Sequence, residues 1–340
     1  MGEAAAHETH PGAALTADIR KGKRTMFFKG VDFWPHNTTY PIMSFRRYCI
    51  GISWVLALLS AVLLFSKGLN FGVDFKGGSL FEVQSTSGPI NIADLRSRLS
   101  GLGIGDVQIQ SVSVPTDALI RVEKRPDDKA QQEAVTKIEA ALKPNIQIRR
   151  TEVVGGAVSD ELKQAGILAV VSAIIGILLY IWFRFEWQFG VAAILALLHD
   201  TLIVLGAFSL LNLEFGLSEV AAVLTLAGYS INDTVVVFDR IRENLRKYKR
   251  MDLEKLMDQS INETLSRTVL TATTTFIAVL SLYVFGTEVI RGFSFAMLFG
   301  IVIGTWSSIF VASPFLLWVG VNRDWSGASS GSSKVEAKTP

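Results

Sequence analysis

Six long apolar runs dominate the pattern of hydrophobic and polar positions along this chain. They cover residues 48–66, 164–183, 188–211, 217–238, 268–285 and 293–319. A helix rises 1.5 Å per residue, so about 20 apolar residues span the hydrocarbon of a bilayer. The pattern therefore predicts six transmembrane helices. The first run follows a long basic arm and lacks an A-x-A cleavage site, so we expect it to be retained.

Lys and Arg residues gather in two regions and predict the orientation of the chain. Seven lie within residues 1–47 and eight within 240–267, whereas the connections 212–216 and 286–292 carry almost none. Basic segments beside transmembrane helices stay in the cytoplasm. We therefore expect a cytoplasmic arm at 1–45, a first helix at 46–66 and a periplasmic insert at 67–163. Helices two to six then fill 164–320, with a cytoplasmic basic loop at 239–266 and a cytoplasmic tail at 321–340.

The insert has the periodicities of a small mixed domain. Alternation or apolar clustering predicts strands at 80–84, 106–112, 119–123 and 146–154, and helical spacing predicts helices at 91–102 and 127–142. The order β-α-β-β-α-β is that of a ferredoxin-like domain. The expected fold class is an α-helical polytopic membrane protein with one α+β ferredoxin-like (βαββαβ) periplasmic domain after its first helix.

Composition agrees with a membrane protein. The chain has 340 residues, 49% of them hydrophobic, and its mean hydropathy of +0.36 is too high for an ordinary soluble protein. Cys49 is the only cysteine, so no intramolecular disulfide can form and the insert must be held by its own core. The aromatic segment 27–34 is expected at the membrane interface. The Ser/Gly-rich tail is expected to be disordered.

Asp233 lies deep inside the fourth apolar run, where a charged side chain costs roughly 2.5–3.5 kcal/mol or more. It comes 15 residues after Ser218, about 22 Å along a helix that enters from outside. Its neighbour Asn232 is also polar, and Arg267 begins the fifth helix as a candidate counter-charge. Two interpretations remain: an ion pair or hydrogen bond that fixes packing, or a titratable site in a proton path.

Other polar residues inside the apolar runs extend this candidate path. His199 and Asp200 lie near the middle of the third run and are either a hydrogen-bonded packing pair or a second polar station. Two such ligands are too few for a metal site. Thr271 shares the helical face of Arg267, so its hydroxyl either lines the path or belongs to close helix packing.

The cytoplasmic loop and the missing motifs limit the alternatives. Residues 239–250 carry charges of alternating sign, which predicts an amphipathic helix on the membrane surface or against a cytoplasmic partner. The sequence contains no Walker A lysine motif and no HExxH, and its GxSxG match at 327–331 lies in the Ser/Gly-rich tail rather than at a predicted strand-to-helix turn, so it has no ATPase, metalloprotease or esterase signature. We therefore expect no catalytic site, cofactor or metal.

Four stretches resemble signature sequences of the SecF members of the SecD/SecF family of protein-export membrane proteins. They are FGVDFKGGSL at 71–80, GGAVSDEL at 155–162, GYSINDTVVVFDRIREN at 228–244 and ETLSRTVLT at 263–271. The resemblance runs from residue 44 to residue 321. It implies a bacterial inner-membrane protein that pairs with SecD in a pseudo-symmetric bundle related to resistance-nodulation-division transporters. It also implies association with the SecYEG channel and use of the proton-motive force to draw unfolded polypeptides outward, with no nucleic-acid partner.

The resemblance also assigns roles to residues. In that family a carboxylate on the fourth helix and an arginine on the fifth are implicated in proton conduction, and Asp233 and Arg267 occupy those positions. Apart from the resemblance, the positions of other polar side chains inside the apolar runs place them in the expected proton path: Asn232, Asp200, His199 and Thr271. The junction beside the first helix is expected to supply a hinge for the external domain: Gly72, Asp74, Gly77 and Gly78.

Two other functional classes stay open. In one, the chain is a passive assembly subunit whose polar groups only lock helices together, while SecD carries the proton coupling. In the other, it is a small-molecule exporter on the same scaffold. Such exporters have two large external inserts and twice as many helices, which disfavours this class.

Overall fold

The computed structural model describes residues 38–111, 114–142 and 144–321, which fall within one compact unit, Asn37–Pro340. The predicted interfacial segment at 27–34 and the predicted disordered tail after residue 321 lie outside the described residues.

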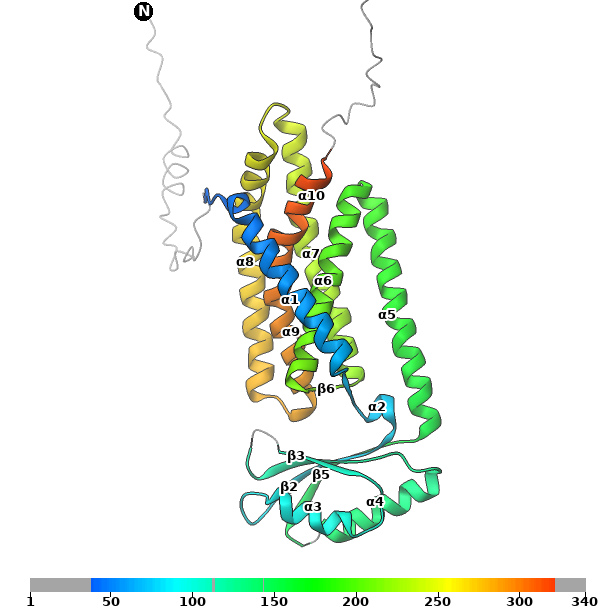
Figure 1. Ribbon diagram of the computed structural model, residues 1–340. Helices are drawn as coiled ribbons and strands as arrows, with labels where there is room; N and C mark the ends of the chain where they lie inside the picture. The colour runs from blue at the N-terminus through cyan, green and yellow to red at the C-terminus, as the bar shows by residue number, and fades with distance from the viewer. Residues whose placement is uncertain (1–37, 112–113, 143, 322–340) are drawn as a thin grey trace, which may run out of the picture. The chain divides into compact units, whose positions relative to one another are not determined.

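Within the described ranges, six helices are long and apolar enough to cross a membrane, as the apolar runs predicted (Figure 1). The first combines a 3-10 turn, η2 (Ile42–Phe45), with α1 (Arg46–Ser66). The last combines α9 (Glu288–Ser307), a π-helical turn, η3 (Ser308–Ala312), and α10 (Ser313–Val319). The four between them are α5 (Gly156–Arg184), α6 (Trp187–Leu211), α7 (Leu217–Lys247) and α8 (Leu253–Phe285).

Three of these helices, α5, α7 and α8, extend furthest beyond their apolar runs. Helix α5 begins at Gly156 rather than at 164, and α8 begins at Leu253 rather than at 268. Residues 239–247 are helical, as predicted, but they continue α7 instead of forming a separate element. An apolar run marks the hydrocarbon, whereas a helix continues until a residue interrupts its backbone bonds. Beyond the run, Asn244 of α7 donates to Ser260 Oγ of α8 at 3.0 Å and so holds the two helices together.

The segment between α1 and α5 forms a four-stranded sheet with two helices. Its elements follow the predicted order: β2 (Gly78–Ser85), α3 (Ile92–Ser100), β3 (Val107–Ser111), β4 (Asp117–Val122), α4 (Asp128–Leu142) and β5 (Ile146–Val154). The strand order is β3-β4-β2-β5, and every neighbouring pair is antiparallel. Helices α3 and α4 lie on one face of this sheet, and the other face is turned toward the ends of the membrane helices (Figure 1).

Alternation along β2 explains the two faces. Phe81 and Val83 are fully buried in a core with α3 and α4, while Leu80 and Glu82 line a cavity on the opposite face. Asn91 fixes the start of α3, since its Oδ1 accepts from the backbone N–H groups of Ala93 at 3.0 Å and Asp94 at 3.2 Å. The sheet is thus held by its own core, as expected without a disulfide.

Two short strands bring distant parts of the chain together. Strand β1 (Asn70–Phe71) follows α1, and β6 (Glu214–Phe215) precedes α7; they pair in parallel. A single helical turn, α2 (Val73–Lys76), then leads from β1 into β2. The connection leaving the first membrane helix is therefore hydrogen-bonded to the connection between α6 and α7.

Candidate functional site

Helix α7 buries Asp233 and exposes its neighbour. Asp233 is 3% exposed, whereas Asn232 is exposed, because successive helical side chains point about 100° apart. The structure therefore separates these two members of the predicted site. Asp233 points into the bundle and Asn232 points out of it.

Asp233 is a buried carboxylate without a hydrogen-bond partner for one of its oxygens. Its Oδ2 is enclosed and makes no hydrogen bond to any residue that the structure describes. Arg267 of α8 is the charged group that acts on it electrostatically, but the two form no ion pair within the described part of the chain. Arg267 is itself exposed on α8. Buried polar groups in native proteins are nearly always hydrogen-bonded, so the state of Asp233 requires an explanation.

Asp200 is the opposite case, because donors surround it. It is fully buried on α6. Its Oδ2 accepts from Ser230 Oγ at 2.6 Å and from Ser307 Oγ at 2.8 Å. Its Oδ1 lies 3.0 Å from Nδ1 of His199. One carboxylate thus connects α6, α7 and α9.

A second polar contact lies beside the Asp200 cluster, toward the π-helical turn η3. The hydroxyls of Thr234 and Ser308 lie 2.8 Å apart, and Thr234 Oγ1 also lies 3.0 Å from the carbonyl oxygen of Ser230. The hydroxyl of Ser313 donates to the carbonyl oxygen of Ser308 at 2.9 Å, five residues earlier. A π-turn inside a helix frequently marks a functional site. Thr234, which takes part in this contact, is the residue directly after Asp233.

The α8 threonines bond mainly to their own helix. Thr271 Oγ1 donates to the carbonyl oxygen of Arg267 at 2.9 Å, and Thr275 Oγ1 donates to that of Thr271 at 2.9 Å. Thr268 differs, since its hydroxyl is buried without a partner. Thr268 is therefore a buried threonine of this helix whose hydroxyl has no hydrogen-bond partner among the described residues. Its place in the apolar run, next to Arg267, was the only signal for it.

The predicted junction residues lie where β1, α2 and β2 meet β6 and the start of α7. Asp74 Oδ2 accepts from the backbone N–H of Leu217 at 2.9 Å. Gly77 and Gly78 have φ values of 73° and 118°, a region that favours glycine. Gly72 has φ −71°, but a Cβ there would lie 2.7 Å from Glu214 Oε1. That these residues form a hinge stays a prediction.

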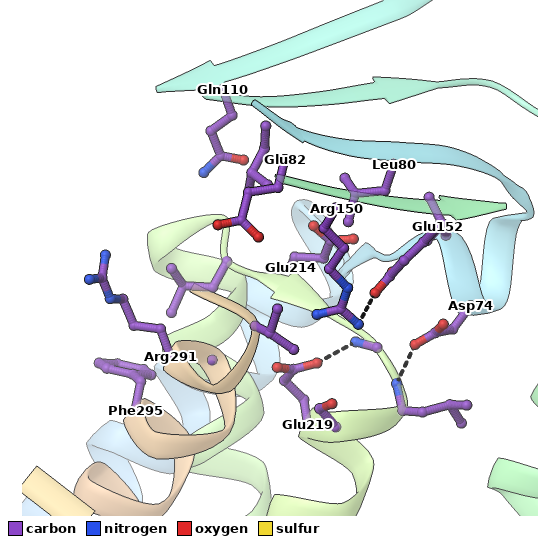
Figure 2. Close-up of a pocket in the computed structure, with 18 of the residues that line it drawn as sticks. Asp74, Leu80, Glu82, Gln110, Arg150, Glu152, Glu214, Glu219, Arg291 and Phe295 are labelled. Atoms are coloured by element: carbon purple, nitrogen blue, oxygen red, sulfur yellow. Dashed lines mark hydrogen bonds and ion pairs between the residues drawn. The ribbon is translucent and has the colours of Figure 1, made fainter. Parts of the chain in front are cut away.

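A cavity of about 780 Å³ lies between the sheet and the ends of α6, α7 and α9 (Figure 2). Glu152 lines the cavity on the side formed by the sheet. Burial raises the pKa of Glu152, and its ion pair with Arg150 lowers this pKa again. The nearby carboxylate of Asp74 raises the pKa further. Figure 2 shows these side chains pointing toward the bundle. Within the described ranges, no group of three or more His, Cys, Asp or Glu side chains is arranged to hold a metal ion.

Sequence reasoning missed the partners of the buried carboxylates. Ser230, Ser307 and Ser308 were visible as polar positions inside apolar runs, but their pairing depends on which helices touch. Arg121 of β4 forms an ion pair with Glu214, and no periodicity in the sequence relates these two residues. Such contacts join segments that are far apart along the chain.

Known proteins match this chain over most of its length. The family model described as protein export membrane protein SecD/SecF, C-terminal, matches residues 134–322, and the SecD/SecF GG motif matches 62–88. Protein translocase subunit SecF of Cereibacter sphaeroides is 47% identical over 85% of this chain and 92% of its own length.

Longer proteins named SecDF match as well. SecDF of Brucella abortus is 42% identical over 84% of this chain. The crystal structure of SecDF from Thermus thermophilus, described as a translocon-associated membrane protein, matches with a TM-score of 0.76 and 37% identity over 84% of this chain. The chain spans 38% and 39% of these two longer proteins. It therefore belongs to the SecD/SecF family of protein export membrane proteins.

Proposed function

We propose that this chain is the SecF-type subunit of a bacterial protein translocase and works in the inner membrane with a SecD-type partner. The names of its relatives support this role. It corresponds to less than half of a fused SecDF chain, which leaves room for a SecD portion beside it. We further propose that the pair adjoins a SecYEG-type channel and uses the proton-motive force, without a catalytic site, to promote export of unfolded polypeptides.

The contacts of the N-terminal segment support the proposed orientation. Met43 N–H donates to Asp258 Oδ1 at 2.7 Å, and Arg46 pairs with Glu254 at 2.5 Å. The start of α1 thus lies beside the start of α8, next to the basic segment that ends α7. Basic residues at one end of the bundle favour the cytoplasmic side. The sheet, at the other end, is then the periplasmic ferredoxin-like domain.

One face of α7 supports pairing with another membrane subunit. Its exposed residues recur at intervals of three and four positions, and they are small or polar: Ser218, Ala221, Thr225, Gly228 and Asn232. A Cβ at Gly228 would meet nothing within 4 Å. Small residues let membrane helices approach closely, so a helix of the SecD-type partner is the occupant we propose.

The difference in hydrogen bonding between Asp200 and Asp233 is the observation that supports a proton role for Asp233. Asp200 has three donors around it and can remain ionised or share a proton without rearrangement. Asp233 has an enclosed oxygen with no donor, so water, a proton or a moved arginine must satisfy it. We propose that Asp233 binds and releases the transported proton. Asp200 and His199 then hold α6, α7 and α9 in position for it.

In this mechanism, ionised Asp233 attracts Arg267, and protonated Asp233 releases it. The change in attraction shifts α7 relative to α8. One charge crossing 100 mV supplies about 2.3 kcal/mol, which changes the ratio of two conformations by more than tenfold. Movement of α7 would carry the periplasmic domain, which we propose to grip and release the emerging polypeptide.

The experiment replaces Asp233 with Asn in cells that depend on this chain. Export of a secreted reporter, followed by pulse-chase, should fall at least tenfold and lose its dependence on the proton gradient. Asn232→Ala, at the neighbouring exposed position, is the matched control and should export normally. Both variants are purified with the SecD-type partner to measure assembly.

The same experiment decides between transport and passive assembly. Normal gradient-dependent export by Asp233→Asn would exclude a proton role for this residue. Failure of the variant to purify with its partner would favour the passive assembly subunit.

A further inference from the structure

Helix α7, which carries Asp233, takes only part of its N-terminal capping from its own side chains. Its N-cap residue is Gly216, which has no side chain to accept from the first backbone N–H groups. Helices usually begin with Ser, Thr, Asp or Asn at this position. The backbone N–H of Gly216 donates instead to Glu219 Oε2 at 2.7 Å, and that of Leu217 donates to Asp74 Oδ2 at 2.9 Å (Figure 2).

Asp74 is therefore a cap supplied from another part of the chain, 143 residues away in sequence. A Cβ at Gly216 would lie 2.7 Å from Asp74 Oδ2. Gly216 has φ −117°, a conformation that any residue can adopt. A Cβ here would therefore displace the incoming carboxylate, and it would not strain the backbone. A negative charge also suits the positive end of the helix dipole.

The opposite segment repeats this arrangement. A Cβ at Gly72 would lie 2.7 Å from Glu214 Oε1, so each connection places a glycine against a carboxylate of the other. Between them, β1 pairs with β6, and Gly72 N–H donates to the carbonyl oxygen of Phe215 at 3.0 Å. The ring of Phe75 stacks on that of Phe215 with centroids 6.5 Å apart.

The sheet is attached to this same place. Arg121 of β4 forms an ion pair with Glu214 and donates to Asn70 Oδ1 at 3.4 Å. We propose that residues 70–76 and 212–217 form a permanent joint, in which Asp74 caps α7 and makes the sheet and α7 move as one body. This rests on the proposed function only in the step that links α7 to proton movement. It differs from the hinge predicted at Gly72 and Asp74, and the tests below decide between them.

The first test separates a cap from a joint. Asp74→Ala removes the carboxylate, and Asp74→Ala combined with Gly216→Asp supplies a cap from within α7 itself. A cap stabilises a helix start roughly fivefold, so we expect Asp74→Ala to lower the thermal unfolding midpoint and the double variant to recover it. Export should fall below the wild-type level in both variants, because neither variant keeps the Asp74 contact that joins residues 70–76 to residues 212–217. Full recovery of export in the double variant, or no effect of Asp74→Ala, would overturn the joint.

The second test closes the joint covalently. Asn70 and Glu214 are paired across β1 and β6, and neighbouring strands lie about 4.8 Å apart, within reach of a disulfide. Asn70→Cys and Glu214→Cys are introduced together with Cys49→Ser in the full chain, in membranes with the SecD-type partner. Oxidation should crosslink the chain rapidly. Both substitutions remove contacts of Arg121, so the reduced double-cysteine protein is the matched control, and the oxidised protein should export at least as well as this control.

The crosslink itself separates this inference from the proposed function. Failure to crosslink, or loss of export on oxidation alone, would show that the connections part and would overturn the joint. The crosslink yield does not depend on proton transport. It should therefore stay high even if Asp233→Asn exports normally and the proton role fails.

Discussion

The two buried carboxylates should respond in opposite ways to the same substitution. Asp200→Ala removes an acceptor that holds Ser230 and Ser307 and contacts His199. Hydrogen bonds between membrane helices contribute about 0.6 kcal/mol on average and up to about 1.7. Three such contacts give a loss of about 2–5 kcal/mol. Asp233→Ala removes a side chain that makes no hydrogen bond in the described part of the chain, so its stability should change by less than about 1 kcal/mol.

The assay uses the single cysteine as a reporter. Cys49 is 8% exposed within the bundle, so a fluorogenic maleimide reacts with it only as the helices separate. A loss of 1 kcal/mol lowers the unfolding midpoint by roughly 2–4 °C. Asp200→Ala should therefore melt about 4–20 °C below the wild type, and Asp233→Ala close to it.

Export gives the complementary result. Asp233→Ala should export poorly although it is stable, because the proposed proton carrier is missing. Equal melting losses in the two variants would refute the contrast between a satisfied and an unsatisfied carboxylate. An unchanged midpoint for Asp200→Ala would refute the clamp between α6, α7 and α9.

Three further predictions test packing and electrostatics. Gly300→Ala should destabilise the bundle by about 1–3 kcal/mol, because its Cβ would overlap a side chain of α7, whereas Gly176→Ala meets nothing within 4 Å and should be neutral in the thiol assay. Ile138→Ala should cost about 2–5 kcal/mol in urea unfolding of the sheet, since Ile138 is fully buried, while Val153→Ala, 45% exposed, should cost little. Burial raises the pKa of Glu152, so its charged form disfavours the folded sheet. Stability should fall as pH rises from about 4.3, the unfolded value, through the folded pKa, and Glu152→Gln should flatten this dependence between pH 4 and pH 7.

Much of the fold was predictable because it depends on local pattern. The apolar runs located six helices, and alternation located the strands of the sheet. Helix ends were less predictable: α7 continues to Lys247 because nothing interrupts its backbone bonds where the apolar run ends. Asp233 was identifiable as a candidate from its cost in the membrane. Its lack of a hydrogen bond was not identifiable, since that depends on which side chains reach it.

The sequence by itself determined the apolar helices, the order of elements in the sheet and the place of Asp233 within an apolar run, because periodicity and transfer energy are properties of neighbouring residues. Only the tertiary structure decided that Asp200 is surrounded by donors and that Asp233 is not. It also showed that Asp74 caps α7 across 143 residues and that Gly216 leaves space for it. Contacts of this kind form between segments brought together by packing, and no local pattern records them.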